Sequence, residues 1–440
     1  MVSRCVRKTG GALLGEGSYG CVFHPAIPCE NEKASRKGVG KVVFDRDEAN
    51  EEFAIMQKIQ KIDPEGKYVN PILYKCKVAG PKMHQHDPDS KNCKLFNKNK
   101  RTAFGSISQL IYKEKGASLE TYQASQKHSL FTIAGIGEYL NLAKGCELLA
   151  KHQLVHRDLK PDNIIRTDAG SLIMIDFGLS ISFDEVFSPM QTDMLEAHYF
   201  VFPPEFSMCD TVVTNFSNDY VKTARSHLAK YSFDASYKGF KKAFSAVGLN
   251  EEIMRNQLED YTEHVIKQIG SIKNGKEDNV VSIFKNFADK IDVWGMGMVL
   301  LSGFINNKQQ NVLEMNCWIR DEVARIIRGC LNVDPVKRFS SKQLVKELTA
   351  LIKSNGVKPT VDIATAISEQ KSPQKPKTPA KKPSPAKKPP VVTPNKLRDC
   401  MRDHSLVDLK TKMRARNLKV TGNKPVLCER LLTYVTPKKN

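Results

Sequence analysis

The chain has 440 residues, more than one compact hydrophobic core usually holds, so two or three domains are expected. Its 40% hydrophobic and 26% charged content is that of a globular protein, and no apolar stretch is long enough to cross a membrane. The net charge is +20. Of this charge, +14 comes from the segment between Lys358 and the C-terminus, which contains 20 Lys and Arg residues and 6 Asp and Glu residues. Such a basic tail predicts an anionic partner, either nucleic acid or an acidic membrane surface.

The cysteines indicate a reducing compartment. There are 11 of them, an odd number, and no two form a C-x-x-C pair. A secreted disulfide framework would be denser and paired, and the first residues contain no apolar core of signal-peptide length. We therefore expect an intracellular protein whose cysteines are reduced.

Composition divides the chain into three parts. Residues 1–355 alternate apolar runs with turn signals, strand-rich up to about Tyr112 and helix-rich after Leu119. This order predicts an α+β domain with a small sheet-rich lobe and a larger helical lobe. Residues 356–395 consist mainly of Lys, Pro, Ser and Thr and predict a disordered basic linker. Apolar periodicity returns in residues 396–436, which predicts a small folded module.

A glycine-rich segment opens the first part. Gly15, Gly17 and Gly20 form a G-x-G-x-x-G pattern, and Val22 follows it. Glycines let a backbone pass close to phosphates, although dinucleotide-binding folds use the same spacing. Those folds continue into a helix, whereas residues 21–23 favour a strand. The segment therefore predicts a hairpin over the phosphates of a nucleotide.

Lys41 lies in the next predicted strand, residues 41–44, where its ammonium group could hold the α- and β-phosphates. It needs a carboxylate partner, which a predicted helix over residues 48–59 can supply. Glu52 is the expected partner, and Glu48 and Glu51 are competing choices. A single exposed lysine is more often a solvated surface charge. The order of glycine loop, strand lysine and helix glutamate favours phosphate binding instead.

The run from His156 to Asn163 predicts a phosphoryl-transfer centre. Asp158 is placed to accept the proton of a substrate hydroxyl, and Lys160 adds a cation beside the transferred group. Asn163 offers an amide oxygen to Mg²⁺, and Asp176, which follows a predicted strand, offers a carboxylate. These residues predict ATP and Mg²⁺ as cofactors.

Taken in order, these motifs are similar to those of the eukaryotic protein kinase family, over about residues 13–351. Glu205 stands in Pro-Pro-Glu where the family has Ala-Pro-Glu, and Asp292 begins a motif similar to its D-x-W-x-x-G helix start. Arg338 resembles a late arginine that pairs with that glutamate, so a buried Glu205–Arg338 pair is expected. The resemblance implies a bilobal protein kinase fold. Lys160 indicates the Ser/Thr class, which acts on protein hydroxyls.

Two alternatives accompany the kinase interpretation. The first is a catalytically inactive relative, a pseudokinase that serves as a DNA-binding scaffold. The second concerns the 86 residues between Glu205 and Asp292, far more than the family usually has. This insertion, about residues 206–288, has helical patterns at 237–244 and 251–272. It is interpreted either as a docking surface or cap, or as a tolerated surface insertion. The divergent spacing is similar to that of kinases carried by large DNA viruses.

Two smaller features each have two interpretations. Ser188 and Thr192 are candidate phosphate carriers that would pair with Arg157, or else ordinary loop hydroxyls. Four possible soft ligands within 18 residues suggest zinc, although their spacing matches no strong pattern and favours a polar loop. These four are Cys76, His84, His86 and Cys93.

The C-terminal module has the pattern of two short helices. Ser405 is a natural N-cap for a helix over residues 405–416, and Pro425 suits the first turn of a second helix. Two helices around a Gly-Asn-Lys turn resemble the SAP motif, a DNA-binding module, which implies DNA as a partner and a nuclear or DNA-associated location. The competing interpretation is a tail that binds protein or membrane. The residues expected to contact DNA phosphates are Lys410, Lys412, Arg414, Arg416, Lys419 and Lys424.

Overall fold

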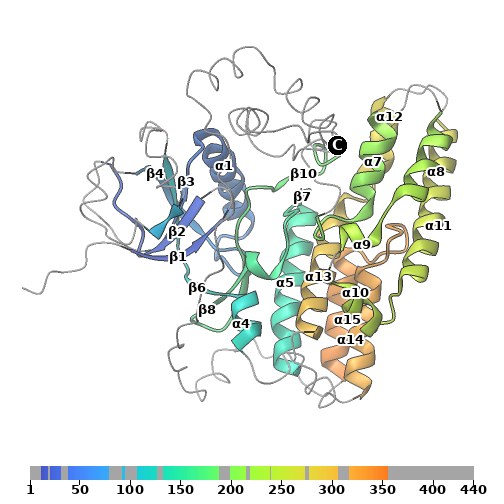
Figure 1. The fold of residues 1–440 in the computed structure, drawn as a ribbon. Coiled ribbons are helices and arrows are strands. Elements are labelled where there is room, and N and C mark those ends of the chain that lie inside the picture. The colour runs from blue at the N-terminus through green and yellow to red at the C-terminus, as the bar shows by residue number, and fades with distance from the viewer. Residues whose placement is uncertain are drawn as a thin grey trace, which may run out of the picture. The chain divides into compact units, whose positions relative to one another are not determined.

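The computed structural model describes one compact unit of the chain (Figure 1). The predicted linker and C-terminal module lie outside the described residues, as do Ser188, Thr192, His84 and His86. The predictions made for those segments are therefore not tested by the fold. The described ranges are 11–17, 20–30, 38–78, 92–94, 107–125, 132–187, 199–214, 219–237, 239–272, 277–305 and 317–354.

The N-terminal region is an antiparallel sheet accompanied by one long helix, as the sequence predicts. The strand order is β1-β2-β3-β5-β4, and the helix α1 packs against β3, β4 and β5 (Figure 1). The interior strand β5 is buried along its whole length, because it has a neighbour on each side and the helix against it. The elements are β1 (Ala12–Glu16), β2 (Gly20–His24), β3 (Val39–Val43), α1 (Arg46–Ile62), β4 (Ile72–Lys77) and β5 (Ser108–Tyr112).

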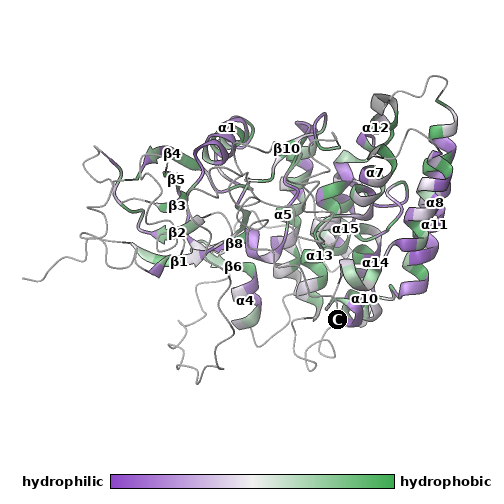
Figure 2. Cartoon of the chain, turned by 45° about the horizontal axis from the view of Figure 1, so that its top comes forward, coloured by the Kyte–Doolittle hydropathy of each residue, from purple (hydrophilic) through white to green (hydrophobic). Residues whose placement is uncertain are grey.

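The helix α1 is amphipathic, and its largely hydrophilic character is visible in Figure 2. Asp45 caps its N-terminus by accepting hydrogen bonds from the N–H groups of Asp47 and Glu48. The buried positions recur every three or four residues and so form one face of the helix. That face carries a carboxylate among apolar side chains. Its residues are Ala49, Glu52, Met56 and Ile59.

Two disulfides crosslink this lobe, which corrects the expectation of reduced cysteines. Cys21 pairs with Cys93, and Cys29 pairs with Cys76. The paired cysteines are 72 and 47 residues apart in the sequence. Their spacing along the chain therefore did not predict that they would pair. Because Cys93 is bonded to Cys21 and Cys76 is bonded to Cys29, neither can serve as a thiolate zinc ligand, and the four-residue zinc interpretation is not supported.

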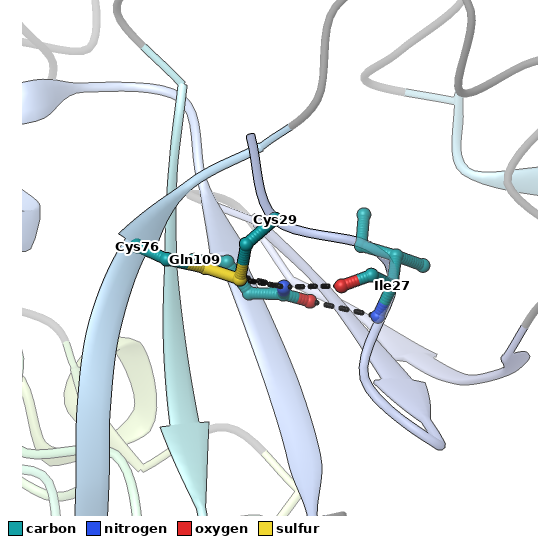
Figure 3. Close-up of a disulfide and its surroundings, with 4 residues drawn as sticks. All are labelled: Ile27, Cys29, Cys76 and Gln109. Atoms are coloured by element: carbon teal, nitrogen blue, oxygen red, sulfur yellow. Dashed lines mark hydrogen bonds between the residues drawn. A yellow bond between two sulfur atoms is a disulfide. The ribbon is translucent and has the colours of Figure 1, made fainter. Parts of the chain in front are cut away.

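Gln109 fixes the strands around the second disulfide (Figure 3). Its amide oxygen accepts from Ile27 N at 3.1 Å, and its amide nitrogen donates to Ile27 O at 2.8 Å. The same nitrogen lies 3.9 Å from Cys29 Sγ and 3.8 Å from Cys76 Sγ. A Cβ on Gly40 would meet the Gln109 amide oxygen at 2.0 Å, so only glycine fits there. This fully buried amide therefore ties β5 to the segment after β2.

The described residues after β5 are mainly helical and include two small sheets, β10–β7 and β6–β8–β9. Helix α13 (Ile291–Ile305) is almost entirely buried, and Gly295 lets it approach the loop after β7. An added Cβ there would lie 2.9 Å from Leu159 O. The remaining elements are β6 (Gly116–Ser118), α4 (Leu119–Ser125), α5 (Ile133–Lys151), β7 (Leu154–Val155), η3 (Pro161–Asn163), β8 (Ile164–Thr167), β9 (Leu172–Met174), β10 (Ile181–Ser182), α7 (Pro204–Thr214), α14 (Cys317–Cys330) and α15 (Ser341–Ser354).

The insertion before α13 is helical and belongs to the core of the large lobe. Tyr237 packs on Trp294 of α13, with ring centroids 5.5 Å apart, so the insertion is not a loose surface addition. The helix expected over residues 251–272 is α11, whereas the one expected over 237–244 is helical only from Lys241 onward. Gly239 adopts φ +92° there and separates two short helices. The elements are α8 (Tyr220–Lys230), α9 (Phe233–Ser236), α10 (Lys241–Ala246), α11 (Glu251–Gly270), α12 (Glu277–Lys285) and η4 (Ala288–Lys290).

Within the described ranges, no helix has both the length and the apolar character needed to cross a membrane. Figure 2 shows hydrophilic and hydrophobic turns side by side along α11. Its buried residues lie on the side that meets α8 and α12, as expected of a helix with one face in water.

His227 in α8 is a buried histidine in the insertion and is expected to make its stability depend on pH. Its ring nitrogen Nε2 lies 2.9 Å from Ser207 Oγ of α7, and its Nδ1 has no hydrogen-bond partner among the described residues. The side chain is buried, and burial lowers its pKa from 6.5 to about 4. Protonation would place an unpaired positive charge inside the protein. The unfolded chain therefore binds this proton near pH 6.5, whereas the folded chain binds it only near pH 4.

We expect this contribution to stability to be complete above pH 6.5 and to be lost as the pH falls toward 4. The loss should amount to about 3 kcal/mol across that window. Thermal melting of His227→Gln across the same pH range should show a shallower acid dependence than the wild type. His152→Gln, at an exposed position, is the matched control and should keep the wild-type slope. Equal slopes for wild type and His227→Gln would contradict the assignment.

Candidate active site

Lys41 lies where the sheet meets the helical region, between two carboxylates. Its Nζ is 2.6 Å from Glu52 Oε2 and 2.7 Å from Asp176 Oδ1. Burial works to lower the pKa of Lys41, but the charges of Asp176 and Glu52 outweigh it and hold the pKa well above its usual range. The ammonium group is therefore charged and fixed in direction.

The structure also separates the three glutamates that compete for Lys41. Glu52 lies on the buried face of α1, whereas Glu51 is exposed. Glu48 is half-buried, and burial followed by the charge of Asp45 raises its pKa to about 7. Only Glu52 is hydrogen-bonded to Lys41 among the three, because it follows Ala49 on the face that turns toward β3.

Tyr112, the last residue of β5, holds the other oxygen of Glu52. Its hydroxyl donates to Glu52 Oε1 at 2.7 Å. Burial, and then the charge of Glu52, raises the pKa of Tyr112 well above its usual value, so the hydroxyl stays protonated and remains a donor. The Glu52 carboxylate is thus fixed by the Lys41 ammonium group at Oε2 and by the Tyr112 hydroxyl at Oε1. Sequence reasoning missed Tyr112, because the contact spans 60 residues and follows no motif.

Asp176 lies at a backbone position that side chains rarely adopt, with φ 64°. Its side chain is only partly buried, and this partial burial works to raise its pKa, but the charge and hydrogen bond of Lys41 outweigh it and lower the pKa. The next residue, Phe177, is buried and packs on His156 with ring centroids 4.4 Å apart. The ring of His156 also lies 3.0 Å from the carbonyl oxygen of Ile175. These contacts hold the Asp176 loop against the loop that carries Asp158.

Asp292, at the start of α13, holds the backbone of the loop that carries Asp158. Its carboxylate accepts the backbone N–H groups of His156 at 2.8 Å and Arg157 at 3.0 Å. Arg157 has φ 67°, so this loop also contains an unusual backbone turn, which the buried carboxylate fixes. The sequence singled out Asp292, and its partners became evident only in the structure.

Asp158 is surrounded by hydrogen-bond donors. Its Oδ2 accepts from Lys160 Nζ at 3.1 Å and from Asn163 Nδ2 at 2.7 Å. Its Oδ1 accepts from the Tyr199 hydroxyl at 2.6 Å. Three side chains therefore orient one carboxylate. Tyr199 is the member that sequence reasoning missed, because no motif marks it.

The side chains expected to hold Mg²⁺ fit a hard cation. The amide N–H₂ group of Asn163 donates hydrogen bonds to the backbone oxygen and to the carboxylate of Asp158. The amide oxygen of Asn163 is therefore left to bind a ligand. Asp176 provides a carboxylate that is 42% exposed and can be reached from solvent. Oxygen donors of these two kinds suit Mg²⁺, and a further ligand would come from water or substrate phosphate.

The three glycines of the loop have different surroundings. An added Cβ at Gly15 or Gly17 would meet no protein atom within 4 Å, so the space beside them is open. At Gly20 the added Cβ would meet Val42 O at 2.0 Å, so this glycine is required by strand packing. Val22 pairs with Lys41 on the neighbouring strand, which places the glycine hairpin next to the lysine.

Glu205 and Arg338 form a buried, bidentate ion pair. It lies away from the side chains around Lys41 and Asp158. Arg338 Nη1 lies 2.5 Å from Glu205 Oε1, and Nη2 lies 2.8 Å from Oε2. Both side chains are 0% exposed. The guanidinium carbon lies 5.0 Å from the centre of the Trp294 ring. The pair thus links α7 to the segment before α15 and to α13.

Comparisons with known proteins agree with this geometry. Residues 103–216 match the family model described as protein tyrosine and serine/threonine kinase, and residues 405–436 match the SAP domain model. A serine/threonine-protein kinase, fray1 of Dictyostelium discoideum, is 47% identical over 178 residues. That match covers 39% of this chain and only 25% of the relative. Residues 103–216 are therefore similar to the protein kinases, and residues 405–436 are similar to the SAP domain.

Proposed function

We propose that this chain is an ATP-dependent Ser/Thr protein kinase, with its kinase domain in residues 1–355 and a SAP module in residues 396–436 that directs it to DNA. The observation that carries the enzymatic part is the placement of Lys41 between Glu52 and Asp176. A lysine fixed in this way keeps its charge and offers it to an anionic group such as a phosphate.

The residues around Asp158 supply the second half of the chemistry. Asp158 accepts the proton of the attacking hydroxyl, and Lys160, bonded to it, offsets negative charge on the transferred group. Asn163 and Asp176 would hold Mg²⁺, which supplies charge neutralisation on the phosphates when bound. The glycine hairpin, with Gly15 and Gly17 on its open side, would cover the phosphates and exclude water.

The test of the enzymatic proposal is transfer of labelled phosphate from Mg·ATP to a basic protein that contains serine and threonine. Lys41→Met should lower the rate by about a hundredfold, because a fixed charge beside the phosphates is lost. Lys115→Met is the matched control: Lys115 sits in an exposed pair with Asp168, and its loss should leave the rate unchanged. Absence of transfer by the wild-type chain would favour the pseudokinase scaffold, which binds DNA without turnover.

The DNA-directed part rests on the SAP match and on charge. The matched residues 405–436 include all six basic side chains assigned to phosphate contact. Contacts of this kind recognise the DNA backbone, so the binding should have little sequence preference and weaken steeply with salt. A nuclear or DNA-associated location within the cell follows from this proposal and stays a prediction.

We expect replacement of Lys410, Lys412 and Arg414 by Gln in the full chain to weaken binding to duplex DNA. Each lost phosphate contact should reduce the slope of log K against log salt by about 0.9. Gel-shift titration at several salt concentrations measures both quantities. The matched control replaces three linker lysines, Lys375, Lys377 and Lys381, and so removes the same charge. Equal effects of the two triple changes would show that net charge alone binds DNA, and would contradict a SAP-specific surface.

A further inference from the structure

Residues 92–94, which come from the stretch between β4 and β5, contact the base of the glycine hairpin. Cys93 is bonded to Cys21 of β2. The Nζ atom of Lys94 lies 4.0 Å from Oε2 of Glu16, at the end of β1. Glu16 and Cys21 are paired across the two strands, directly before and after the glycine turn. Two consecutive residues of a distant segment therefore hold both strands of the hairpin at the same level.

The disulfide lies on the face of the sheet opposite the Lys41 ammonium group. Val22 of β2 pairs with Lys41 of β3. The preceding residue Cys21 pairs with Val42. Because successive side chains of a strand point to opposite faces, the disulfide and the Lys41 side chain lie on opposite faces. The disulfide is buried there in an apolar cluster that includes Phe23 and Val42. It can therefore position the hairpin without occupying the space of a nucleotide.

The hairpin has little packing on its open side. An added Cβ at Gly15 or Gly17 would meet no protein atom within 4 Å. The turn is closed by a backbone hydrogen bond from Gly17 N to Gly20 O at 2.9 Å. Strand β1 lies at the edge of the sheet, and most of its residues are exposed. A segment with few packed contacts opens readily, and a ligand that binds only its closed form is weakened by the fraction of time spent open.

We propose that residues 92–94 are a clamp on the glycine hairpin, and that the Cys21–Cys93 disulfide is a positioning crosslink for nucleotide binding. This inference rests on the proposed function, because it concerns the nucleotide of the transfer reaction. With the crosslink in place, the hairpin covers the phosphates at a small cost in conformational entropy. Without it, the hairpin is in position for a smaller fraction of the time, and Mg·ATP binds more weakly by that factor.

The clamp makes nucleotide binding depend on redox state. A dithiol reductant breaks the bond between the two sulfurs, so that Cys21 and Cys93 each become a thiol and the dithiol is oxidised to its own disulfide. The proposed DNA-directed function places the chain where thiols are kept reduced, and disulfides in such proteins are usually transient, catalytic or redox-sensing. Oxidation of this cysteine pair should therefore strengthen nucleotide binding, and its reduction should weaken it.

Equilibrium binding of Mg·ATP to the full chain tests the clamp. Cys93→Ala should weaken binding about tenfold, the result for a hairpin that is in position about a tenth of the time. KM for ATP should rise by the same factor, while kcat at saturating ATP stays within about twofold, because bound nucleotide then holds the hairpin. The matched control replaces Cys29 and Cys76 by Ala. It removes the other disulfide of this lobe, which joins β4 to the segment after β2, and should keep the wild-type Kd.

A second measurement uses the wild-type chain and so does not depend on the folding of a variant. The chain is incubated with dithiothreitol, and aliquots are alkylated at intervals so that mass spectrometry identifies the disulfide that has opened. Cys76 is half-buried whereas Cys21 and Cys93 are fully buried, so the Cys29–Cys76 bond should open first. Mg·ATP binding should stay unchanged at that stage, weaken as the Cys21–Cys93 bond opens, and return on reoxidation. Unchanged binding after that bond has opened would overturn the clamp.

The outcomes separate the clamp from the proposed function. Phosphate transfer by the wild type, together with equal Mg·ATP affinity in the wild type and Cys93→Ala, would overturn the clamp and leave the kinase function standing. Binding without transfer would contradict the kinase function, and the two binding measurements would still decide the clamp. Failure of the wild type to bind Mg·ATP would overturn both. Equal weakening in Cys93→Ala and in the Cys29, Cys76 double variant would show a general effect of lost crosslinks and would also overturn the clamp.

Discussion

Replacement of Asp158 by asparagine is expected to lower phosphate transfer by about a thousandfold, while ATP binding stays at the wild-type level. The carboxylate is the group placed to accept the hydroxyl proton, and an amide of the same shape cannot accept it. The amide also offers an N–H₂ group where the wild type has an acceptor. On the Oδ2 side this group would face the donors Lys160 and Asn163, and on the Oδ1 side it would face Tyr199.

Single-turnover phosphate transfer and equilibrium nucleotide binding, measured on the same preparations, check this prediction. Asp168→Asn is the matched control: this exposed residue lies in the turn between β8 and β9 and should leave both quantities unchanged. A rate within a few-fold of the wild type in Asp158→Asn would remove Asp158 from the role of proton acceptor.

Local patterns in the sequence predicted much of the sheet-rich lobe. The runs at residues 21–23, 41–44 and 109–112 fall on β2, β3 and β5, and the periodicity at 48–59 lies within α1. These patterns depend on neighbours along the chain, so they can be read without coordinates. The choice among Glu48, Glu51 and Glu52 could not be made in this way, because it depends on which face of α1 turns toward Lys41.

Contacts between distant segments account for what the sequence did not reveal. The hydroxyl of Tyr199 meets Asp158 across 41 residues, and Tyr112 meets Glu52 across 60. No motif marks either tyrosine, and each gains its role only when the folded chain brings its partner close. The disulfides follow the same rule, because cysteines on separate strands meet only after the sheet has formed. Sequence motifs therefore named the charged groups of the site but not the phenols that fix them.

The largest change in stability should come from breaking the Glu205–Arg338 pair. Arg338→Met leaves the Glu205 carboxylate buried without its counter-charge, and we expect the free energy of unfolding to fall by about 3–5 kcal/mol. The variant also loses the hydrogen bond from Arg338 Nε to Asn332 O at 2.9 Å and the guanidinium contact with Trp294. Arg338→Lys should be destabilised too, because an ammonium group cannot form the paired, planar contact with a carboxylate.

The neighbouring residue provides the control that isolates burial as the cause. Lys337 pairs with Asp260 at 2.6 Å, a distance as short as those in the buried pair, but the two side chains are 55% and 60% exposed. Lys337→Met should therefore change stability by less than about 1 kcal/mol in urea denaturation. The double change Glu205→Leu with Arg338→Met should recover part of the loss, since it removes both charges at once. If Lys337→Met and Arg338→Met shifted the urea midpoint equally, proximity of the charges rather than their burial would set the contribution of the pair.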